Sequence, residues 1–363
     1  MLDQARDHQR DEAVLSWIAT RLGLRCGILH ANSIDRGQLL SPALVHHGIE
    51  NELGGLIWEL TPQSSRDQLA SADRLRDLWL QHNSAHLARL SALIRHWPSD
   101  APAPLLFKGA DLELHVYGSF NLSPGCRMSS DWDLIVPDPT YQDVLKTWTQ
   151  RLGSPKLPRS ARLPNEPPHE VGFNVDGLLI EVHRDPAPRF FSMLRGVTLW
   201  ERAAYSQTLE GFSARQPTPI DRLLLWLVNY AKAGGLTRAL SWVDLTLILI
   251  VLYRHNPELF AEESSSQAPL RKILKSDGLY IASREALTQW VTSPLADTCL
   301  HVSEQIKMWL SQEISRPELH FKRRLTPTSG RLRLGVAQFR LCAPSLRAQY
   351  LRRALLSVWT SHR

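Results

Sequence analysis

A short proline-rich segment divides the chain into two regions with different patterns of apolar residues. Residues 97–104 read WPSDAPAP, and prolines at this density cannot continue a helix and bias the residues before them towards extended conformations. Before this segment, apolar residues recur at helical spacing, for example at Val14, Ile18 and Leu22. The sequence therefore predicts a helical N-terminal region over residues 1–100 and a new structural unit after it.

The new unit, residues 101–215, has the pattern of a small mixed sheet with helices. Short apolar runs bounded by turn residues predict strands, and an Asp176-Gly177 pair between two strand-like segments predicts a hairpin. The predicted elements in chain order are a strand at 105–107, a helix at 110–117, a strand at 134–136, a helix at 141–152 and hairpin strands at 170–175 and 178–183.

Helical spacing returns after Pro219. Candidate helices cover residues 223–232, 240–253, 271–281 and 296–314. We expect a helical lobe over residues 216–315 and a separate basic segment over residues 316–363. The predicted fold class is therefore α+β, with a small mixed β-sheet core flanked by helical N-terminal and C-terminal regions.

Composition excludes several classes of protein. With 363 residues, 43% of them hydrophobic and 21% charged, the chain has ordinary globular usage and is long enough for two or three domains. The longest apolar run, near residues 245–252, is too short to span a membrane and is typical of a buried helix. The four cysteines are far apart and form no Cys-x-x-Cys pair, so we expect neither a zinc site nor a disulfide framework, and a reducing, cytoplasmic location.

Positive charge is concentrated in the last part of the sequence. Residues 316–363 hold eleven Lys or Arg and one acid, so this segment carries more than the net charge of +6 of the whole chain. A cationic segment raises the affinity for phosphate backbones, and Phe321, Phe339, Tyr350 and Trp359 are interleaved with its cations. The same spacing also fits an amphipathic helix that packs onto the body of the protein, so both interpretations stay open.

Two aspartates in one predicted strand are the first candidate for chemistry. Residues 127–136 read RMSSDWDLIV. Residues two apart in a strand share a face, so Asp131 and Asp133 would present their carboxylates side by side, with Trp132 and Leu134 on the other face. Such charges repel unless a cation lies between them, and magnesium prefers hard oxygen ligands. Asp-x-Asp also arises by chance in a chain of this length, so the surrounding strand and loop have to support the metal hypothesis.

The hairpin offers a third carboxylate. Glu181 lies between two apolar residues, and an acid in an apolar strand is costly unless it is paired or bound to a metal. His183 would lie on the same face, where it could assist an acceptor or pack as a core residue. The alternative for Glu181 is a structural ion pair with Arg184 or Arg189.

In this order the motifs resemble the uncharacterised nucleotidyltransferase family of the DNA polymerase beta-like superfamily. That family has a strand ending in Leu-Lys-Gly-Ala, an Arg shortly before an Asp-Ile-Asp strand, an acid-x-His strand, a helix with a Lys, and a later Trp-x-x-Asp-Leu element. The resemblance spans roughly residues 85–255. The corresponding segments here are LFKGA at 106–110, RMSSDWDLIV at 127–136, IEVH at 180–183, LWLVNYAK at 225–232 and LSWVDL at 240–245.

The resemblance implies a metal-dependent nucleotidyltransferase. Such an enzyme transfers a nucleoside monophosphate from an NTP to the hydroxyl of a small-molecule, peptide or protein acceptor and releases pyrophosphate. Asp131, Asp133 and Glu181 would be the catalytic residues and would ligate Mg²⁺ or Mn²⁺. The residues that the resemblance implies for binding the nucleotide are Lys108, Gly109, Arg127, Ser130 and Lys232.

The chain departs from the family pattern at three points. Trp132 replaces the usual Ile, which suits a core position behind the aspartates, and the His that often accompanies the helix Lys is absent beside Lys232. Two candidates exist for the phosphate-side loop. Gly-Ser at 118–119 has the usual superfamily spacing, whereas Lys-Gly at 108–109 follows the better strand and matches the closer family. We expect Asp244 to fix the helical lobe to the sheet.

Two further hypotheses stay open beside transfer to a small molecule, peptide or protein. In the first, the acceptor is RNA, as in toxin-like nucleotidyltransferases, with the basic C-terminal segment as the binding element. In the second, the chain is a catalytically silent scaffold that retains the fold, an interpretation that the presence of all three acids disfavours.

Overall fold

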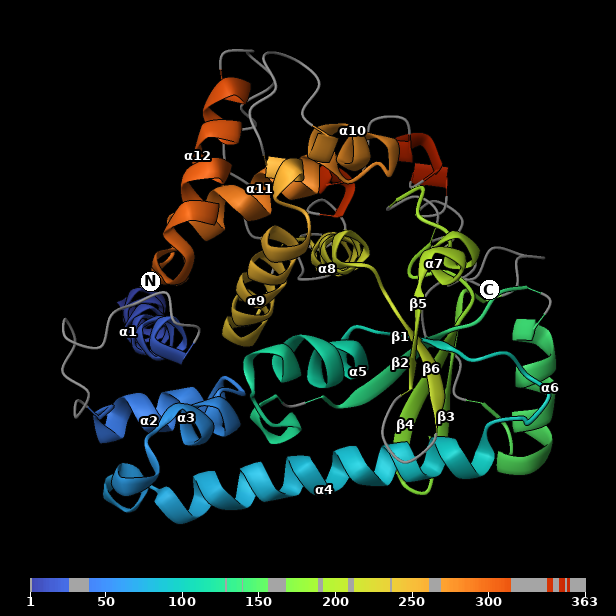
Figure 1. Ribbon diagram of the computed structural model, residues 1–363, viewed down its shortest axis with the longest axis horizontal. Helices are drawn as coiled ribbons and strands as arrows, with labels where there is room; N and C mark the ends of the chain where they lie inside the picture. Colours follow the sequence, from blue (N-terminus) through green and yellow to red (C-terminus); the bar gives the residue numbers. More distant parts are fainter. Residues whose placement is uncertain are drawn as a thin grey trace.

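The proline-rich segment separates a long helix from a mixed sheet, as the sequence predicts (Figure 1). The computed structural model describes residues 2–25, 39–127, 129–138, 140–155, 168–188, 192–207, 212–235, 237–260, 269–314, 338–341, 346–349 and 351–352. Over these residues the fold is α+β, with one six-stranded sheet in the order β3-β4-β2-β1-β6-β5. The strands are β1 (Leu105–Phe107), β2 (Asp131–Ile135), β3 (Glu170–Val175), β4 (Leu178–His183), β5 (Ala204–Gln207) and β6 (Ser213–Gln216).

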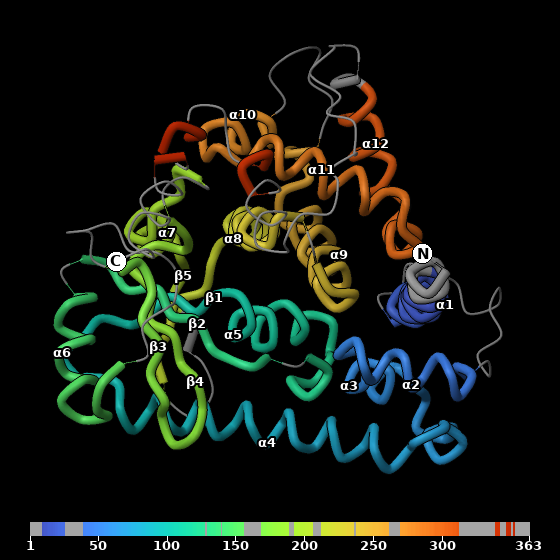
Figure 2. Tube along the Cα trace, turned by 180° about the vertical axis from the view of Figure 1, so that it is seen from behind, coloured from blue at the N-terminus to red at the C-terminus, as the bar shows by residue number. Residues whose placement is uncertain are grey.

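The region before the sheet is helical. In Figure 1 the longest of its helices, α4, runs along the lower edge beneath both the N-terminal helices and the sheet, and Figure 2 shows the same arrangement from behind. The helix α4 therefore joins the two parts of the molecule. The elements are α1 (Leu2–Arg25), α2 (Pro42–Glu50), α3 (Gly54–Leu60), η2 (Gln63–Gln68) and α4 (Ala72–His96).

The two faces of the sheet have different chemistry. Trp132, Leu134, Ile180 and Val182 are fully buried in one apolar cluster with residues of α4 and of α6 (Thr140–Leu152). Because side chains alternate along a strand, the residues between them lie on the opposite face. The apolar positions of β2 and β4 thus fix the acidic residues of both strands on the face away from α6.

The hairpin forms with the predicted register. Val175 pairs with Leu178, and the two residues between them have positive φ angles, 52° at Asp176 and 84° at Gly177. Left-handed conformations at both central positions match the twist of the flanking strands, and Asp-Gly adopts them readily. This register places Glu170 opposite His183.

The connection from β1 to β2 consists of short helical turns. A π-helix lies at its centre and a 3-10 turn follows it, which makes this segment more irregular than the single helix predicted over residues 110–117. The elements are α5 (Gly109–Asp111), η3 (Leu112–Tyr117), η4 (Gly118–Phe120) and η5 (Pro124–Cys126).

The prediction of four helices after Pro219 is correct for the first two and wrong for the third. Residues 271–281 do not form one helix, because Gly278 adopts a φ of 71° and ends α10, and α11 begins at Tyr280. The fourth begins as a 3-10 turn. The elements are α8 (Pro219–Lys232), α9 (Ala239–His255), η7 (Pro257–Phe260), α10 (Pro269–Ser276), α11 (Tyr280–Val291), η8 (Pro294–Cys299) and α12 (Leu300–Ile314).

The sequence patterns missed α7 (Gly196–Arg202) and the strands β5 and β6. These strands lack an apolar alternation, so tertiary contacts determine them. The guanidinium of Arg215 lies 3.8 Å from the ring centroid of Trp200 and 4.1 Å from that of Tyr205, and β6 pairs in parallel with β1. A cation close to two aromatic rings thus takes the place of an apolar residue in β6, the strand next to the edge of the sheet.

One hydrophobic cluster extends through the N-terminal helices, the sheet and the helical lobe. It contains Val14 of α1, Leu105 of β1 and Leu310 of α12, and α1 packs against η8 and α9. The predicted regions therefore share a core, and the boundaries drawn between them stay a prediction. None of the helices that the structure describes has the length and apolar character needed to cross a membrane.

The approach of α3 to the turn η5 yields a stability prediction. A Cβ on Gly55 would lie 2.2 Å from the carbonyl oxygen of Gly125, which is a backbone atom and cannot move aside cheaply. We expect Gly55→Ala to lower the free energy of unfolding by about 1–3 kcal/mol in urea denaturation. The control is Gly118→Ala, because nothing lies within 4 Å of the added methyl group. Equal stability of the two variants would contradict this packing.

Candidate functional site

The strand register brings two of the predicted carboxylates together. The strands β2 and β4 run in parallel, and Asp133 pairs directly with Glu181. On the other side of β2, Asp133 pairs with Phe107 at the end of β1. Neighbouring strands lie about 4.8 Å apart, so the two acids project side by side from one face. The side chain of Glu181 keeps 25% of its surface exposed, whereas Asp133 is buried.

Asp133 contacts the ammonium group of Lys108 and the imidazole of His183. Lys108 donates a hydrogen bond of 2.5 Å from Nζ to Asp133 Oδ1, and His183 Nε2 lies 2.9 Å from the same oxygen. Burial alone would raise the pKa of Asp133, but the charge of Lys108 and the contact with His183 outweigh it and hold this pKa well below its usual range. Asp133 is therefore ionised at neutral pH.

Asp131 has the opposite electrostatic environment. Its closest described partner is Ser130, whose hydroxyl donates a hydrogen bond of 3.2 Å to Oδ1. Partial burial and the repulsion of Asp133 and Glu181 raise the pKa of Asp131, against the attraction of Lys108. The two predicted aspartates thus lie on one face of β2. The charge of Asp133 is compensated by its neighbours, whereas that of Asp131 is compensated less.

The segment after β1 adopts a strained backbone next to the acids. Lys108 has φ 49° and ψ −124°, a conformation that residues with a side chain rarely adopt. At Gly109 a Cβ would lie 2.4 Å from Ser129 Oγ, so only glycine fits there without a shift of the serine. Of the two phosphate-side candidates, residues 108–109 line the cleft beside the acids, and residues 118–119 are not among its lining residues.

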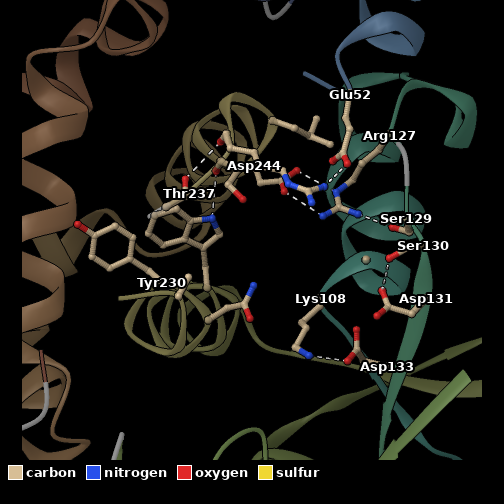
Figure 3. A pocket seen from close by; sticks show the side chains of 17 residues that line it. Glu52, Lys108, Arg127, Ser129, Ser130, Asp131, Asp133, Tyr230, Thr237 and Asp244 are labelled. Atoms are coloured by element: carbon tan, nitrogen blue, oxygen red, sulfur yellow. Dashed lines mark hydrogen bonds and ion pairs between the residues drawn. The ribbon is translucent and has the colours of Figure 1, made fainter. Parts of the chain in front are cut away.

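The cleft has a volume of about 320 Å³ and lies between the sheet and the helical lobe. In Figure 3, Asp131, Asp133 and Lys108 lie on the sheet side, and Tyr230 and Thr237 lie on the side of the lobe. Most of its surface is polar. The lining residues are Glu52, Lys108, Gly109, Arg127, Ser129, Ser130, Asp131, Asp133, Trp226, Asn229, Tyr230, Ala233, Thr237, Arg238, Leu240, Ser241 and Asp244.

Arg127 and Asp244, both among the residues that line the cleft, form a bidentate pair (Figure 3). Arg127 Nε and Nη2 each donate a bond of 3.0 Å to one carboxylate oxygen of Asp244, and the Tyr117 hydroxyl donates a third, also of 3.0 Å. The attraction of Asp244 overcomes burial and raises the pKa of Arg127. As expected, Asp244 ties α9 to the segment before β2. Arg127 also donates a hydrogen bond to the hydroxyl of Ser129, another residue that lines the cleft. Its guanidinium therefore lines the cleft and holds neighbouring lining residues in place.

A second layer of charged groups lies behind Asp133. Glu170 Oε2 lies 3.6 Å from His183 Nδ1, 3.4 Å from Lys232 Nζ and 3.2 Å from His169 Nε2. Burial would raise the pKa of Glu170, but the contact with His169 and the charge of Lys232 outweigh it and hold this pKa below its usual range. Lys232, predicted to bind the nucleotide, therefore contacts Glu170 and is not among the residues that line the cleft.

Glu170 was not recognised from sequence, although the signal was present. The Asp-Gly turn fixes the hairpin register, and counting back from it places Glu170 opposite His183. The predictions for the basic C-terminal segment fall mostly outside the described residues, including those for Phe321, Tyr350 and Trp359. Within its described part, Gln338 donates a bond of 2.7 Å to the carbonyl oxygen of Lys232.

Three side chains form a group that fits a metal ion. One ligand atom from each of Asp133, Glu181 and His183 lies within 4.8 Å of the others. Neither ring nitrogen of His183 has a hydrogen-bond partner among the described residues, although the ring is completely buried. Orphaned buried nitrogens are rare, and their presence between two carboxylates fits a bound cation. Asp131 lies beside this group and is not part of it.

Comparisons of the chain with protein-family models, curated proteins and solved structures give no match.

The unequal environments of the two aspartates predict opposite effects of amidation. Asp131→Asn removes a carboxylate whose ionisation the folded state disfavours, so we expect a higher melting temperature at neutral pH in the presence of a chelator. Asp133→Asn leaves Lys108 and His183 without their anion and should cost about 3 kcal/mol. Differential scanning calorimetry of both variants provides the measurement.

The stabilising effect of Asp131→Asn should depend on pH. Its pKa is raised on folding, so the destabilisation by Asp131 develops as pH rises from the unfolded value of about 3.9 through the higher folded value. The gain in melting temperature of Asp131→Asn should therefore be small near pH 4 and greatest at neutral pH. A gain that shrinks with rising pH would refute the assigned environment.

Proposed function

We propose that the cleft binds a nucleoside triphosphate with divalent metal ions and transfers its nucleoside monophosphate to an acceptor hydroxyl. The observation that carries the proposal is the placement of Asp131, Asp133 and Glu181 side by side on one face of the sheet, next to the cleft that Lys108 and Arg127 line. The resemblance of residues 85–255 to the polymerase beta-like nucleotidyltransferases supports the same assignment of residues.

The charge of the site supports binding of a cation. Asp133 and Glu181 both raise the pKa of Asp131, and the attraction of the Lys108 ammonium does not fully offset them. This leaves an excess of negative charge at Asp131. A divalent cation would offset this excess, and a metal shared with phosphate oxygens suits carboxylate ligands.

The walls of the cleft suit the two ends of a nucleotide. On the sheet side, Gly109 lets the backbone come close to a phosphate, and the Lys108 ammonium is within reach of the same space. On the lobe side, Trp226 and Tyr230 stack at 5.5 Å, and the exposed amide of Asn229 lies on the same helix. We infer that phosphates bind over β2 and that the base lies against α8.

Each residue has a positioning or electrostatic role in the proposed transfer. Bound metal ions would supply the Lewis acidity that stabilises the entering and leaving oxygens at the α-phosphate. Asp131 and Asp133 hold the triphosphate side of the site and Glu181 the acceptor side, while Lys108 offsets charge that develops on the leaving pyrophosphate. The Arg127–Asp244 pair keeps the lobe at a fixed distance from the sheet.

The acceptor carries the hydroxyl group that receives the nucleoside monophosphate. An RNA acceptor would bind through the basic segment 316–363, which lies mostly outside the described residues. The cleft residues favour no acceptor class over another. Transfer assays should therefore include total RNA, protein and small hydroxyl compounds together.

Incubation of the protein with labelled NTPs and Mg²⁺ or Mn²⁺ tests the activity. We expect metal-dependent labelling of an acceptor and release of pyrophosphate, with both falling at least about 100-fold in Asp131→Asn and Glu181→Gln because charge stabilisation at the reacting phosphate is lost. Digestion of the labelled product with nuclease or protease then separates RNA from protein acceptors.

Asp143→Asn is the matched control, because it makes the same chemical change on the exposed surface of α6, behind the sheet. It should transfer as well as the unchanged protein. Failure to bind any NTP with either metal would overturn the enzymatic proposal and favour the silent scaffold.

A further inference from the structure

We propose that Asp133, Glu181 and His183 form a binding site for a divalent transition metal ion, with the imidazole Nε2 of His183 as one ligand. The site would select such an ion over Mg²⁺. For the role of the ion in transfer, this inference rests on the proposed function; for the existence of the site, it rests on the geometry of these three side chains.

His183 Nε2 lies close to two carboxylate groups. Nε2 lies 2.9 Å from Asp133 Oδ1 and 3.4 Å from Glu181 Oε2, yet neither contact has the geometry of a hydrogen bond. An imidazole buried between two carboxylates would normally donate to one of them, because an unpaired buried nitrogen costs about 1–3 kcal/mol. Three ligand atoms within 4.8 Å of one another, with no hydrogen bond from the imidazole to either carboxylate, are an arrangement that a metal ion fits.

The surroundings hold the ring in this orientation. Phe107 packs edge-on against the His183 ring, with centroids 4.9 Å apart. On the other side of the ring, the carboxylate of Glu170 lies 3.6 Å from Nδ1, longer than a hydrogen bond but in the position from which a carboxylate orients a ligand histidine. Lys232 and His169 in turn hold Glu170. This gives Lys232 a task other than binding phosphate.

The ligand set decides the kind of ion. Magnesium is bound through oxygen and rarely through nitrogen, whereas imidazole suits zinc, iron, nickel and copper, and mixed sets of carboxylate and imidazole also hold manganese. The His183 nitrogen therefore favours a transition metal. Asp131 belongs to no metal-binding group with a histidine among the described residues. It remains available for an ion bound mainly through phosphate oxygens, so the two aspartates would serve two different ions.

The site is accessible and does not need nucleotide to form. Glu181 keeps 25% of its side-chain surface exposed, so an ion can enter from that side while His183 stays buried. Lys108 contacts the same oxygen of Asp133 as His183 does, and its ammonium would stabilise the carboxylate in the metal-free protein. Metal binding should thus be measurable in the absence of any NTP.

Electron paramagnetic resonance with Mn²⁺ as the probe tests the assignment on the full-length protein. We expect Mn²⁺ to bind without nucleotide in excess Mg²⁺ and to show nitrogen hyperfine coupling in pulsed spectra. His183→Gln should lose the coupling and bind Mn²⁺ at least about tenfold more weakly. His183→Gln alters a buried side chain and could disturb folding, so Glu170→Gln, which changes only the residue behind the ring, serves as a second test. It should weaken Mn²⁺ binding about tenfold and retain the nitrogen coupling.

Matched controls separate this inference from the proposed function. His46→Gln alters an exposed histidine on α2 and should leave the coupling and the affinity unchanged. Asp131→Asn should abolish transfer and keep the nitrogen coupling. Bound Mn²⁺ without nitrogen coupling, or equal affinity in His183→Gln, overturns the histidine site even if NTP transfer proceeds. Coupling without any transfer leaves the metal site standing and rejects the enzymatic proposal instead.

Discussion

The buried carboxylate of Asp133 is the constraint on which the rest of the site depends. It is buried at the centre of the sheet, and an uncompensated charge there would cost several kcal/mol. Two strands supply the groups that offset it, because β1 delivers Lys108 from its end and β4 delivers His183, while β3 places Glu170 behind the histidine. The order β3-β4-β2-β1 is therefore also the order of the charged groups across the site.

This arrangement leaves Asp131 as the group whose charge the fold does not balance. Its pKa is raised by burial and by its two acidic neighbours, so the folded protein retains unsatisfied negative charge at the mouth of the cleft. Strain is also present nearby, in the left-handed backbone of Lys108. Both features lower the stability of the metal-free chain, and both are expected where a site is built to receive a cation and its ligand rather than to stabilise the fold.

Much of the fold could be predicted from local patterns. The Asp-Gly pair at 176–177 fixed the hairpin, the prolines at 98–104 fixed the end of α4, and the alternation around Trp132 fixed which face of β2 holds the acids. The strands β5 and β6 could not be found this way, because they are polar and form through pairing with β1 and stacking around Arg215. The break between α10 and α11 at Gly278 was likewise hidden by a continuous helical period.

The residues of the candidate site likewise divide into those that a local sequence pattern predicts and those that depend on tertiary contacts. Asp131, Asp133 and Glu181 were predicted because a strand period and an apolar context are properties of the sequence itself. The roles of Arg127, Lys232 and His183 were not, because each depends on a partner far along the chain: Asp244 for Arg127, Glu170 for Lys232, and Asp133 for His183. A cation's type and position indicate that it neutralises something. Only the tertiary contacts decide whether its anion is a phosphate or a carboxylate of the protein. Arg127 and Lys232 contact carboxylates outside the aspartate pair, namely those of Asp244 and Glu170. Of these three cations, Lys108 is the one that contacts one of the paired aspartates.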